Sequence, residues 1–136
     1  CDWYARAVVE DAEYRERRGL HPEDPTRIGR YRVLRRLGSG GMAVVYAAYD
    51  PELDRQIAVK RLDPVRFSAS DPRVVARFQR EAQSMARVSH PHVCPVYDVG
   101  VEDDSIFIAM ELVHGLTLRH WQQDTARPWT EVMRMY

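Results

Sequence analysis

LGSGGMAVV, residues 37–45, is the stretch from which the fold of this chain can be worked out. Glycine has no side chain, so backbone N–H groups in such a stretch can come close to phosphate oxygens. Glycine-rich hairpin turns are common, however, and most of them bind nothing. A dinucleotide-binding fold would place a helix after the glycines, and a P-loop would need Gly-Lys followed by Ser or Thr. Residues 43–49 have a β-like pattern instead, which favours a hairpin that covers a ligand.

The neighbouring segments are also β-like. The predicted strands are residues 31–37, 43–49, 56–62, about 93–101 and about 105–113. The first three are joined by connections that are too short for a parallel crossover, which predicts an antiparallel meander. Pro95 cannot donate a ladder hydrogen bond, so the fourth strand fits best if it begins after this proline or lies at a sheet edge.

One main helix is predicted between the third and fourth strands. Asp71 suits its N-cap and Pro72 its first position. Its apolar residues recur every three or four positions and are expected to face a core: Val75, Phe78, Ala82, Met85 and Val88. The pattern becomes helical again after Gly115, and Thr130 is suited to cap a last helix. This order predicts an α+β fold with a five-stranded antiparallel sheet.

The first part of the chain differs from the rest. A roughly helical period runs to Arg18, Gly19 ends it, and residues 21–25 have the composition of a linker. The predicted organisation is therefore a helical leader with a linker, residues 1–27, followed by one domain, residues 28–136.

Composition excludes several classes of function. Lys and Arg number 20 and so do Asp and Glu, which gives no basic field for nucleic acid or an anionic membrane. Cys1 and Cys94 form no disulfide framework, and Cys94 is interpreted as a small buried apolar residue. His90 and His92 lack a third ligand nearby, so no metal site is predicted. No apolar run approaches the ~18 residues of a membrane span, and a cytoplasmic protein is expected.

Two charged residues are candidates for chemistry. Strand alternation puts Lys60 on the same face as Ala58, one strand beyond the glycine hairpin, where it could reach phosphates or simply be exposed. Glu81 lies on the inward edge of the predicted helix and needs a partner. That partner is either Lys60 or Arg77 one helical turn earlier, and the sequence leaves both open.

The order of these features resembles the small lobe of eukaryotic-like protein kinases. The resemblance rests on the glycine hairpin, Ala-Val-Lys at 58–60, the helix with Glu81, and Met-Glu-Leu-Val at 110–113. Together with His-Pro-His-Val at 90–93, the sequences of these motifs most resemble those of bacterial serine/threonine kinases. The resemblance covers residues 28–136 and implies that the later helical segments begin the second lobe.

The resemblance implies a role for each matching residue. Gly38, Gly40 and Gly41 would cover the phosphates of ATP, and Lys60, paired with Glu81, would hold the α- and β-phosphates. Leu37, Val45 and Ala58 would enclose the adenine ring. Met110 would be the gatekeeper, and the backbone of Glu111 and Val113 would bond the adenine. Met85 and Val96 would join the hydrophobic column between the lobes.

Two departures from the family pattern matter. Ala43 replaces the third glycine, which would stiffen the loop slightly. The catalytic base and the Mg²⁺ ligands of this family are expected beyond Tyr136, so residues 1–136 alone would bind ATP weakly and transfer no phosphate. The resemblance therefore implies a serine/threonine kinase acting on protein hydroxyls only as the complete protein.

Two other functions stay open. A pseudokinase or nucleotide-binding scaffold would share the small lobe without catalysis. A small α+β interaction domain would use the glycines only to make a turn. The protein substrate is not indicated by the sequence.

Overall fold

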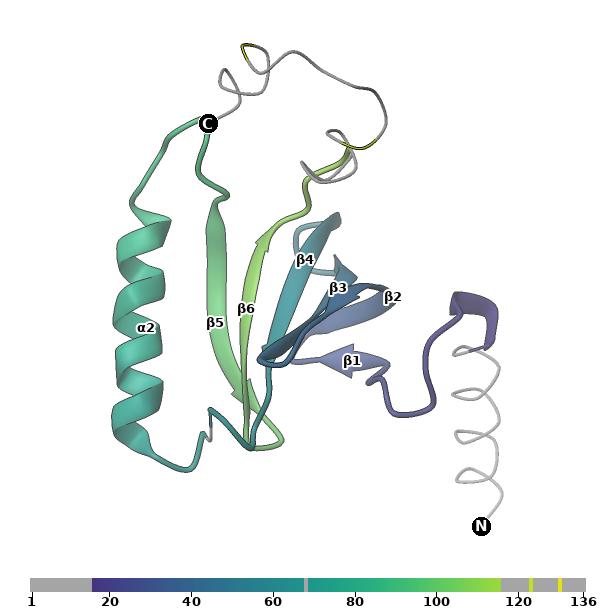
Figure 1. Cartoon of the computed structure of the whole chain (residues 1–136), viewed down its shortest axis with the longest axis horizontal. Coiled ribbons are helices and arrows are strands. Elements are labelled where there is room, and N and C mark those ends of the chain that lie inside the picture. The colour runs from purple at the N-terminus through teal and green to yellow at the C-terminus, as the bar shows by residue number, and fades with distance from the viewer. Residues whose placement is uncertain (1–15, 68, 116–122, 124–129, 131–136) are drawn as a thin grey trace.

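The computed structural model of the chain describes residues 16–67, 69–115, 123 and 130. Figure 1 shows a curled sheet with the helix α2 (Pro72–Ala86) beside one edge of it. The predicted leader helix lies almost wholly outside the described residues, and so do the helical segments expected after Gly115 and Thr130.

The sheet is antiparallel throughout, as predicted, but it has six strands in place of five. Its members are β1 (Arg27–Ile28), β2 (Tyr31–Ser39), β3 (Ala43–Asp50), β4 (Arg55–Leu62), β5 (Val96–Glu102) and β6 (Ser105–Glu111), in the order β1-β2-β3-β4-β6-β5. The additional strand, β1, has only two residues, which is too short to produce an alternating pattern. β5 begins directly after Pro95, as expected.

The tight turns follow from acidic residues that tolerate the left-handed conformation. Glu102 pairs with Ser105, and the residues between them, Asp103 and Asp104, have φ angles of 49° and 58°. Positive φ at both positions defines a type I′ hairpin, whose twist matches that of the strands. Between β3 and β4, Asp54 has a φ of 47°, and its carboxylate accepts a hydrogen bond of 2.5 Å from the Tyr49 hydroxyl.

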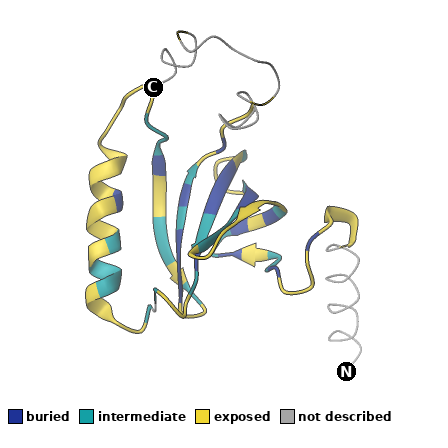
Figure 2. Cartoon of the chain, viewed as in Figure 1, coloured by how far each residue is buried: buried dark blue, intermediate teal, exposed yellow. Residues whose placement is uncertain are grey.

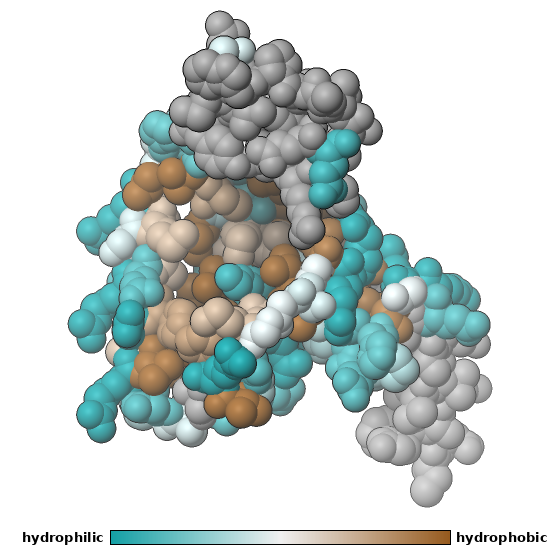
Figure 3. All heavy atoms as spheres, viewed as in Figure 1, coloured by the Kyte–Doolittle hydropathy of each residue, from teal (hydrophilic) through white to brown (hydrophobic). Residues whose placement is uncertain are grey.

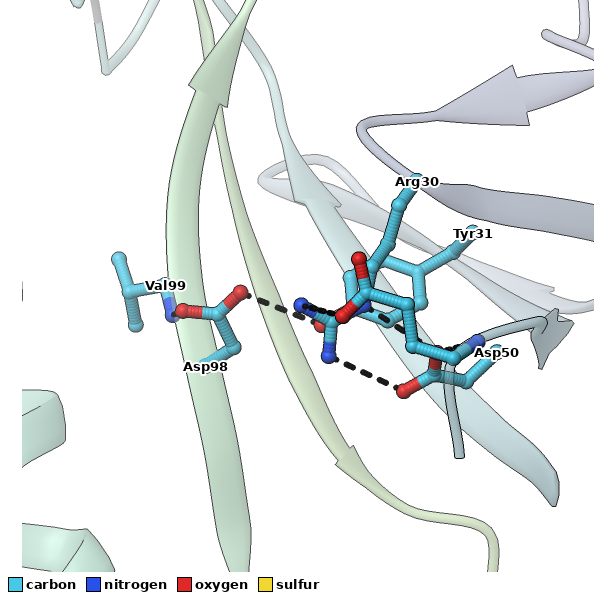
Figure 4. Close-up of polar contacts among 6 residues, drawn as sticks. Arg30, Tyr31, Asp50, Asp98 and Val99 are labelled. Atoms are coloured by element: carbon cyan, nitrogen blue, oxygen red, sulfur yellow. Dashed lines mark hydrogen bonds and ion pairs between the residues drawn. The ribbon is translucent and has the colours of Figure 1, made fainter. Parts of the chain in front are cut away.

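The sheet curls until its two ends meet. β2 and β5 are far apart in strand order, yet the Tyr31 hydroxyl donates to the Asp98 carboxylate at 3.2 Å (Figure 4). The Gly29 amide likewise donates to Glu102 Oε2 at 2.7 Å. Burial and the Asp98 charge raise the pKa of Tyr31 to about 12, so its hydroxyl remains a donor at neutral pH.

A hydrophobic cluster fills the inside of the curl. Its buried members are Leu20, Ile28, Tyr31, Val33, Tyr46, Ala48, Ile57, Val59, Phe107 and Ala109. Phe107 lies over glycine, because a Cβ atom built on Gly100 would come within 2.3 Å of its ring. The other face of the strands carries a second, smaller cluster around Ala58. Figure 2 shows that burial is concentrated in the strands.

The helix, α2 (Pro72–Ala86), begins as predicted: the Asp71 side chain caps it by accepting from the Arg73 amide at 2.9 Å. The predicted apolar stripe is only partly covered, which corrects the expectation of a continuous buried stripe. Ala82 is buried, whereas Met85 and Val88 are 47% and 46% exposed. The reason is that α2 packs chiefly against β5, at the edge of the sheet, and so covers only the middle of the stripe.

Candidate functional site

The apolar floor of the candidate site is formed across three strands. Ala47 of β3, Ala58 of β4 and Leu112 after β6 are buried together, and Val45 and Met110 pack against them. The strand register explains the arrangement, since Ala58 lies opposite both Ala47 and Met110. This floor brings together Val45, Ala58 and Met110. Ala47 and Leu112 were not predicted as site residues. Strand alternation could have identified them, because each lies two residues from a floor residue and therefore shares its face.

The remaining residues expected around the adenine ring are more exposed. Leu37 is 39% exposed and does not belong to the floor cluster, because a register irregularity separates Arg36 from Gly38 at that point of β2. Val113, just beyond β6, is 71% exposed. Leu37 and Val113 therefore stand at the margin of the floor in this structure, and their roles stay predictions.

The backbone groups of the residue after Met110 already make contacts within the protein. The Glu111 amide donates to the Pro95 carbonyl at 3.0 Å, and the Glu111 carbonyl accepts a contact of 3.6 Å from Cys94 Sγ. Burial, together with the Glu111 charge, raises the pKa of the Cys94 thiol, which keeps it protonated as a weak donor. A ligand could therefore use the second lone pair of the Glu111 carbonyl, but not its N–H.

The glycine hairpin leaves its backbone accessible. A Cβ atom built on Gly38, Gly40 or Gly41 would meet nothing within 4 Å. The hairpin is closed by a bond of 3.0 Å from the Gly40 amide to the Ala43 carbonyl. Ala43 is the first residue of β3 and has no positive φ, so alanine causes no backbone strain at the third glycine position. The expected stiffening has no visible cost in this conformation.

Lys60 lies beside the floor, and Glu81 does not pair with it. In the register of the sheet Lys60 is opposite Val45 on one side and Ile108 on the other. Among the described residues no ion pair joins Lys60 to Glu81. The Glu81 carboxylate instead accepts a hydrogen bond of 2.9 Å from Arg77 Nε, with side chains 56% and 79% exposed. Of the two partners that the sequence left open, this structure contains Arg77.

The Arg77–Glu81 pair is weak enough to exchange. Exposed i,i+4 pairs are worth about 0.3–0.5 kcal/mol because water screens both charges. Little energy therefore opposes the release of Glu81 from Arg77 toward another cation. Val96 is buried while Met85 is exposed, so the expected contribution of these two residues to a hydrophobic column remains a prediction.

The arrangement suits a planar apolar ring attached to an anion. Figure 3 shows apolar residues gathered between α2 and the strands, with polar residues around them. The floor can receive the ring, the open hairpin can approach the anion, and Lys60 supplies a positive charge next to both. Within the described residues, no three His, Cys, Asp or Glu side chains lie close enough together to hold a metal ion.

None of the helices in the described part is long and apolar enough to cross a bilayer. This finding concerns only the residues that the structure describes.

Comparison with known proteins agrees with this geometry. The model of the protein kinase domain family matches residues 31–135. The chain is 49% identical over 94 residues to the serine/threonine-protein kinase PrkC of Bacillus subtilis, which covers 68% of this chain and 14% of that protein. It is 43% identical over 98 residues to the probable serine/threonine-protein kinase PknB of Lactococcus lactis, covering 71% and 15% respectively.

A solved structure shares the fold. The kinase domain of Mycobacterium tuberculosis PknI superposes with a TM-score of 0.65 and 34% identity, covering 79% of this chain and 44% of that domain. The chain thus spans a small part of the length of the curated relatives and less than half of the solved domain. It belongs to the protein kinase family and covers the N-terminal lobe of a kinase domain similar to those of bacterial serine/threonine kinases.

Proposed function

We propose that this chain is the ATP-binding part of a protein serine/threonine kinase, which as a complete protein transfers the γ-phosphate of ATP to protein hydroxyls. The observation that carries the proposal is the apolar floor of Val45, Ala58 and Met110. Val45 of this floor pairs with Lys60 on one side and with Gly38 of the open glycine hairpin on the other. These are the groups that kinases use to hold ATP, in the same order along the chain.

In the proposed complex the adenine ring lies on the floor. The Glu111 carbonyl and the Val113 amide bond the edge of the ring, and Leu37 closes over it when the hairpin descends. Gly38, Gly40 and Gly41 allow the hairpin backbone to approach the phosphates without side-chain interference. The ammonium group of Lys60 lies next to the α- and β-phosphates.

Glu81 has a conditional role in this proposal. When α2 moves inward, Glu81 leaves Arg77 and fixes Lys60 by an ion pair. The structure, in which Glu81 pairs with Arg77, is then a form without the Lys60–Glu81 pair, and breaking the present pair costs little because it is exposed.

Phosphoryl transfer also needs a base and Mg²⁺, which neutralises the charge that develops on the phosphates. Kinases of this family place the base and the Mg²⁺ ligands in the second lobe. The transfer reaction is therefore proposed for the complete protein.

Nucleotide binding is tested by titrating ATP into the complete protein by calorimetry. Lys60→Met is compared with Arg61→Met, a matched control, because Arg61 is the next residue on β4 and points to the opposite face. We expect a weaker ATP complex only for Lys60→Met. Equal affinities for the two variants and the wild type would contradict the proposed site.

The pair between Arg77 and Glu81 also fits a second function, a pseudokinase that binds nucleotide without transferring phosphate. Mass spectrometry of the complete protein after incubation with ATP, Mg²⁺ and a generic basic protein distinguishes the two. New phosphoserine or phosphothreonine that disappears in Lys60→Met supports the kinase. Nucleotide binding without new phosphate supports the pseudokinase.

A further inference from the structure

A buried carboxylate from the segment before β1 lies at the base of the glycine hairpin. Asp24 is only 1% exposed, although the sequence gives residues 21–25 the composition of a linker. Leu20 is buried in the main hydrophobic cluster, and the Thr26 carbonyl accepts from the Val33 amide at 2.9 Å. The segment that contains Asp24 is thus fixed to the sheet on both sides of it.

The Asp24 carboxylate joins two neighbouring strands. Its Oδ1 accepts hydrogen bonds from Arg36 Nη2 of β2 and from the Tyr46 hydroxyl of β3, the latter at 2.8 Å. Its Oδ2 accepts from the His21 amide at 3.0 Å. Arg36 and Tyr46 are direct partners in the β2–β3 register, so one carboxylate holds one cross-strand pair.

This carboxylate is charged at neutral pH. Burial alone would raise its pKa, but the hydrogen bonds from Arg36, Tyr46 and His21 outweigh burial and lower the pKa below the ordinary value of 3.8. Burial and the Asp24 charge raise the pKa of Tyr46 to about 12, so the phenol remains a donor. The pair of donors and their acceptor therefore form a stable unit over the physiological pH range.

The position of this unit along the strands is what connects it with function. The register of the hairpin is irregular between Arg36 and Gly38, and the next pairs join Gly38 to Val45 and Ser39 to Val44. Beyond that irregularity, a hollow of about 230 Å³ lies beside the hairpin, lined by residues that include Gly40, Ala43 and Tyr46. Two contacts hold the β3 side of the tip: Ala43 pairs with Leu62 of β4, and the Asp63 amide donates to the Met42 carbonyl at 2.9 Å. On the β2 side, Arg36–Tyr46 is the last pair before the irregularity, so the direction of this side depends on that pair.

We propose that Asp24 is a positioning residue for the glycine-rich hairpin: by holding Arg36 and Tyr46 together it sets the angle at which residues 38–43 lie over the nucleotide. The proposal rests on the proposed ATP-binding function. Asp24 faces away from the nucleotide and acts through the cross-strand pair. Without Asp24, Arg36 and Tyr46 lose the acceptor that joins them, and residues 38–43 move over a wider range of angles.

The test uses the complete protein with Asp24→Asn and, as a matched control, Asp50→Asn. Asp50 is also 1% exposed and also bonded to an arginine, Arg30, with Nη2 to Oδ2 at 3.1 Å, but it lies at the far end of β3 from the hairpin. Amide hydrogen exchange of residues 37–45 and the Kd for ATP are measured well below the melting temperature. The melting temperature itself is the third quantity measured.

We expect Asp24→Asn to accelerate exchange in residues 37–45 and to raise the Kd for ATP by on the order of fivefold to tenfold, the effect of losing one typical intramolecular hydrogen bond. Asp50→Asn should lower the melting temperature and leave both other quantities unchanged. Tyr46→Phe, which removes one donor and keeps the ring, should act in the same direction as Asp24→Asn with a smaller effect, and it serves as the test if Asp24→Asn does not fold.

The possible outcomes distinguish a failure of the positioning role of Asp24 from a failure of the proposed ATP binding. If Asp24→Asn or Tyr46→Phe lowers only the melting temperature, with exchange and Kd as in the wild type, Asp24 is merely structural and the proposal is wrong. If the wild type itself binds no ATP, the proposed function fails, while the exchange of residues 37–45 still decides whether Asp24 positions the hairpin.

Discussion

Replacing Gly100 by alanine should destabilise the lobe through a single contact. Gly100 pairs with Phe107 across β5 and β6, and an added Cβ would come within 2.3 Å of Phe107 Cζ and 2.6 Å of Cε1. Real Cβ atoms do not approach so closely, so the ring must move. Phe107 is 6% exposed in the main cluster, where overpacking typically costs about 1–3 kcal/mol.

The magnitude can be isolated because Gly100 has no other constraint. Its φ is outside the left-handed region, so alanine fits the backbone and only the ring opposes it. Gly40→Ala is the matched control, since an added Cβ there meets nothing within 4 Å, and it should change the free energy of unfolding by less than about 0.5 kcal/mol.

A double-mutant cycle with Phe107→Leu tests whether contact with the Phe107 ring causes the loss of stability in Gly100→Ala. Leucine removes the atoms that would collide, so Gly100→Ala should cost clearly less in the Phe107→Leu background than alone. The free energy of unfolding is measured by urea denaturation of the complete protein with a probe in this lobe. Additive costs of the two substitutions would show that the ring contact is not the cause.

Three further predictions concern the turn, the helix and the buried acids. Asp103→Gly should stabilise the protein by about 0.5–1 kcal/mol in urea denaturation, because glycine adopts the φ of 49° without strain; a loss of stability would show that aspartate is not strained at this position of the turn. Arg77→Ala should free Glu81 for Lys60 and lower the KM for ATP of the complete protein by up to roughly twofold, the value of an exposed pair; a higher KM would mean that Arg77 helps binding. The pKa values of Asp24 and Asp50 are both lowered from 3.8, so the stability that they contribute is complete above that pH and is lost as the pH falls through their folded values. Acid unfolding monitored by circular dichroism should therefore be less steep in Asp50→Asn than in the wild type, and an unchanged slope would exclude Asp50 as a contributor.

Local patterns predicted most of the sheet and the start of the helix. Period-two alternation placed Ala58 and Lys60 on one face of the third predicted strand. In the structure Ala58 belongs to the smaller hydrophobic cluster, whereas its neighbours Ile57 and Val59 belong to the larger cluster on the opposite face. Asp71 was identified as the cap because capping depends on a few adjacent residues. β1 could not be found, since a two-residue strand carries no period.

Contacts between distant segments were not accessible from the sequence. Asp24 lies in a segment with the composition of a linker, and its partners Arg36 and Tyr46 are on strands whose exact register is disturbed by an irregularity. The partner of Glu81 depends on where α2 lies relative to β4, and no local pattern determines that position. For the same reason the sequence predicted a buried Met85, which the structure exposes.

The most direct test of the central claim is to incubate the complete protein with γ-labelled ATP and Mg²⁺ beside its Lys60→Met variant and to measure label on protein serine and threonine. We expect label on serine and threonine with the wild type and little or no label with Lys60→Met. Equal labelling by both proteins would contradict the assigned role of Lys60, and no labelling by a wild type that binds ATP would contradict the kinase activity itself.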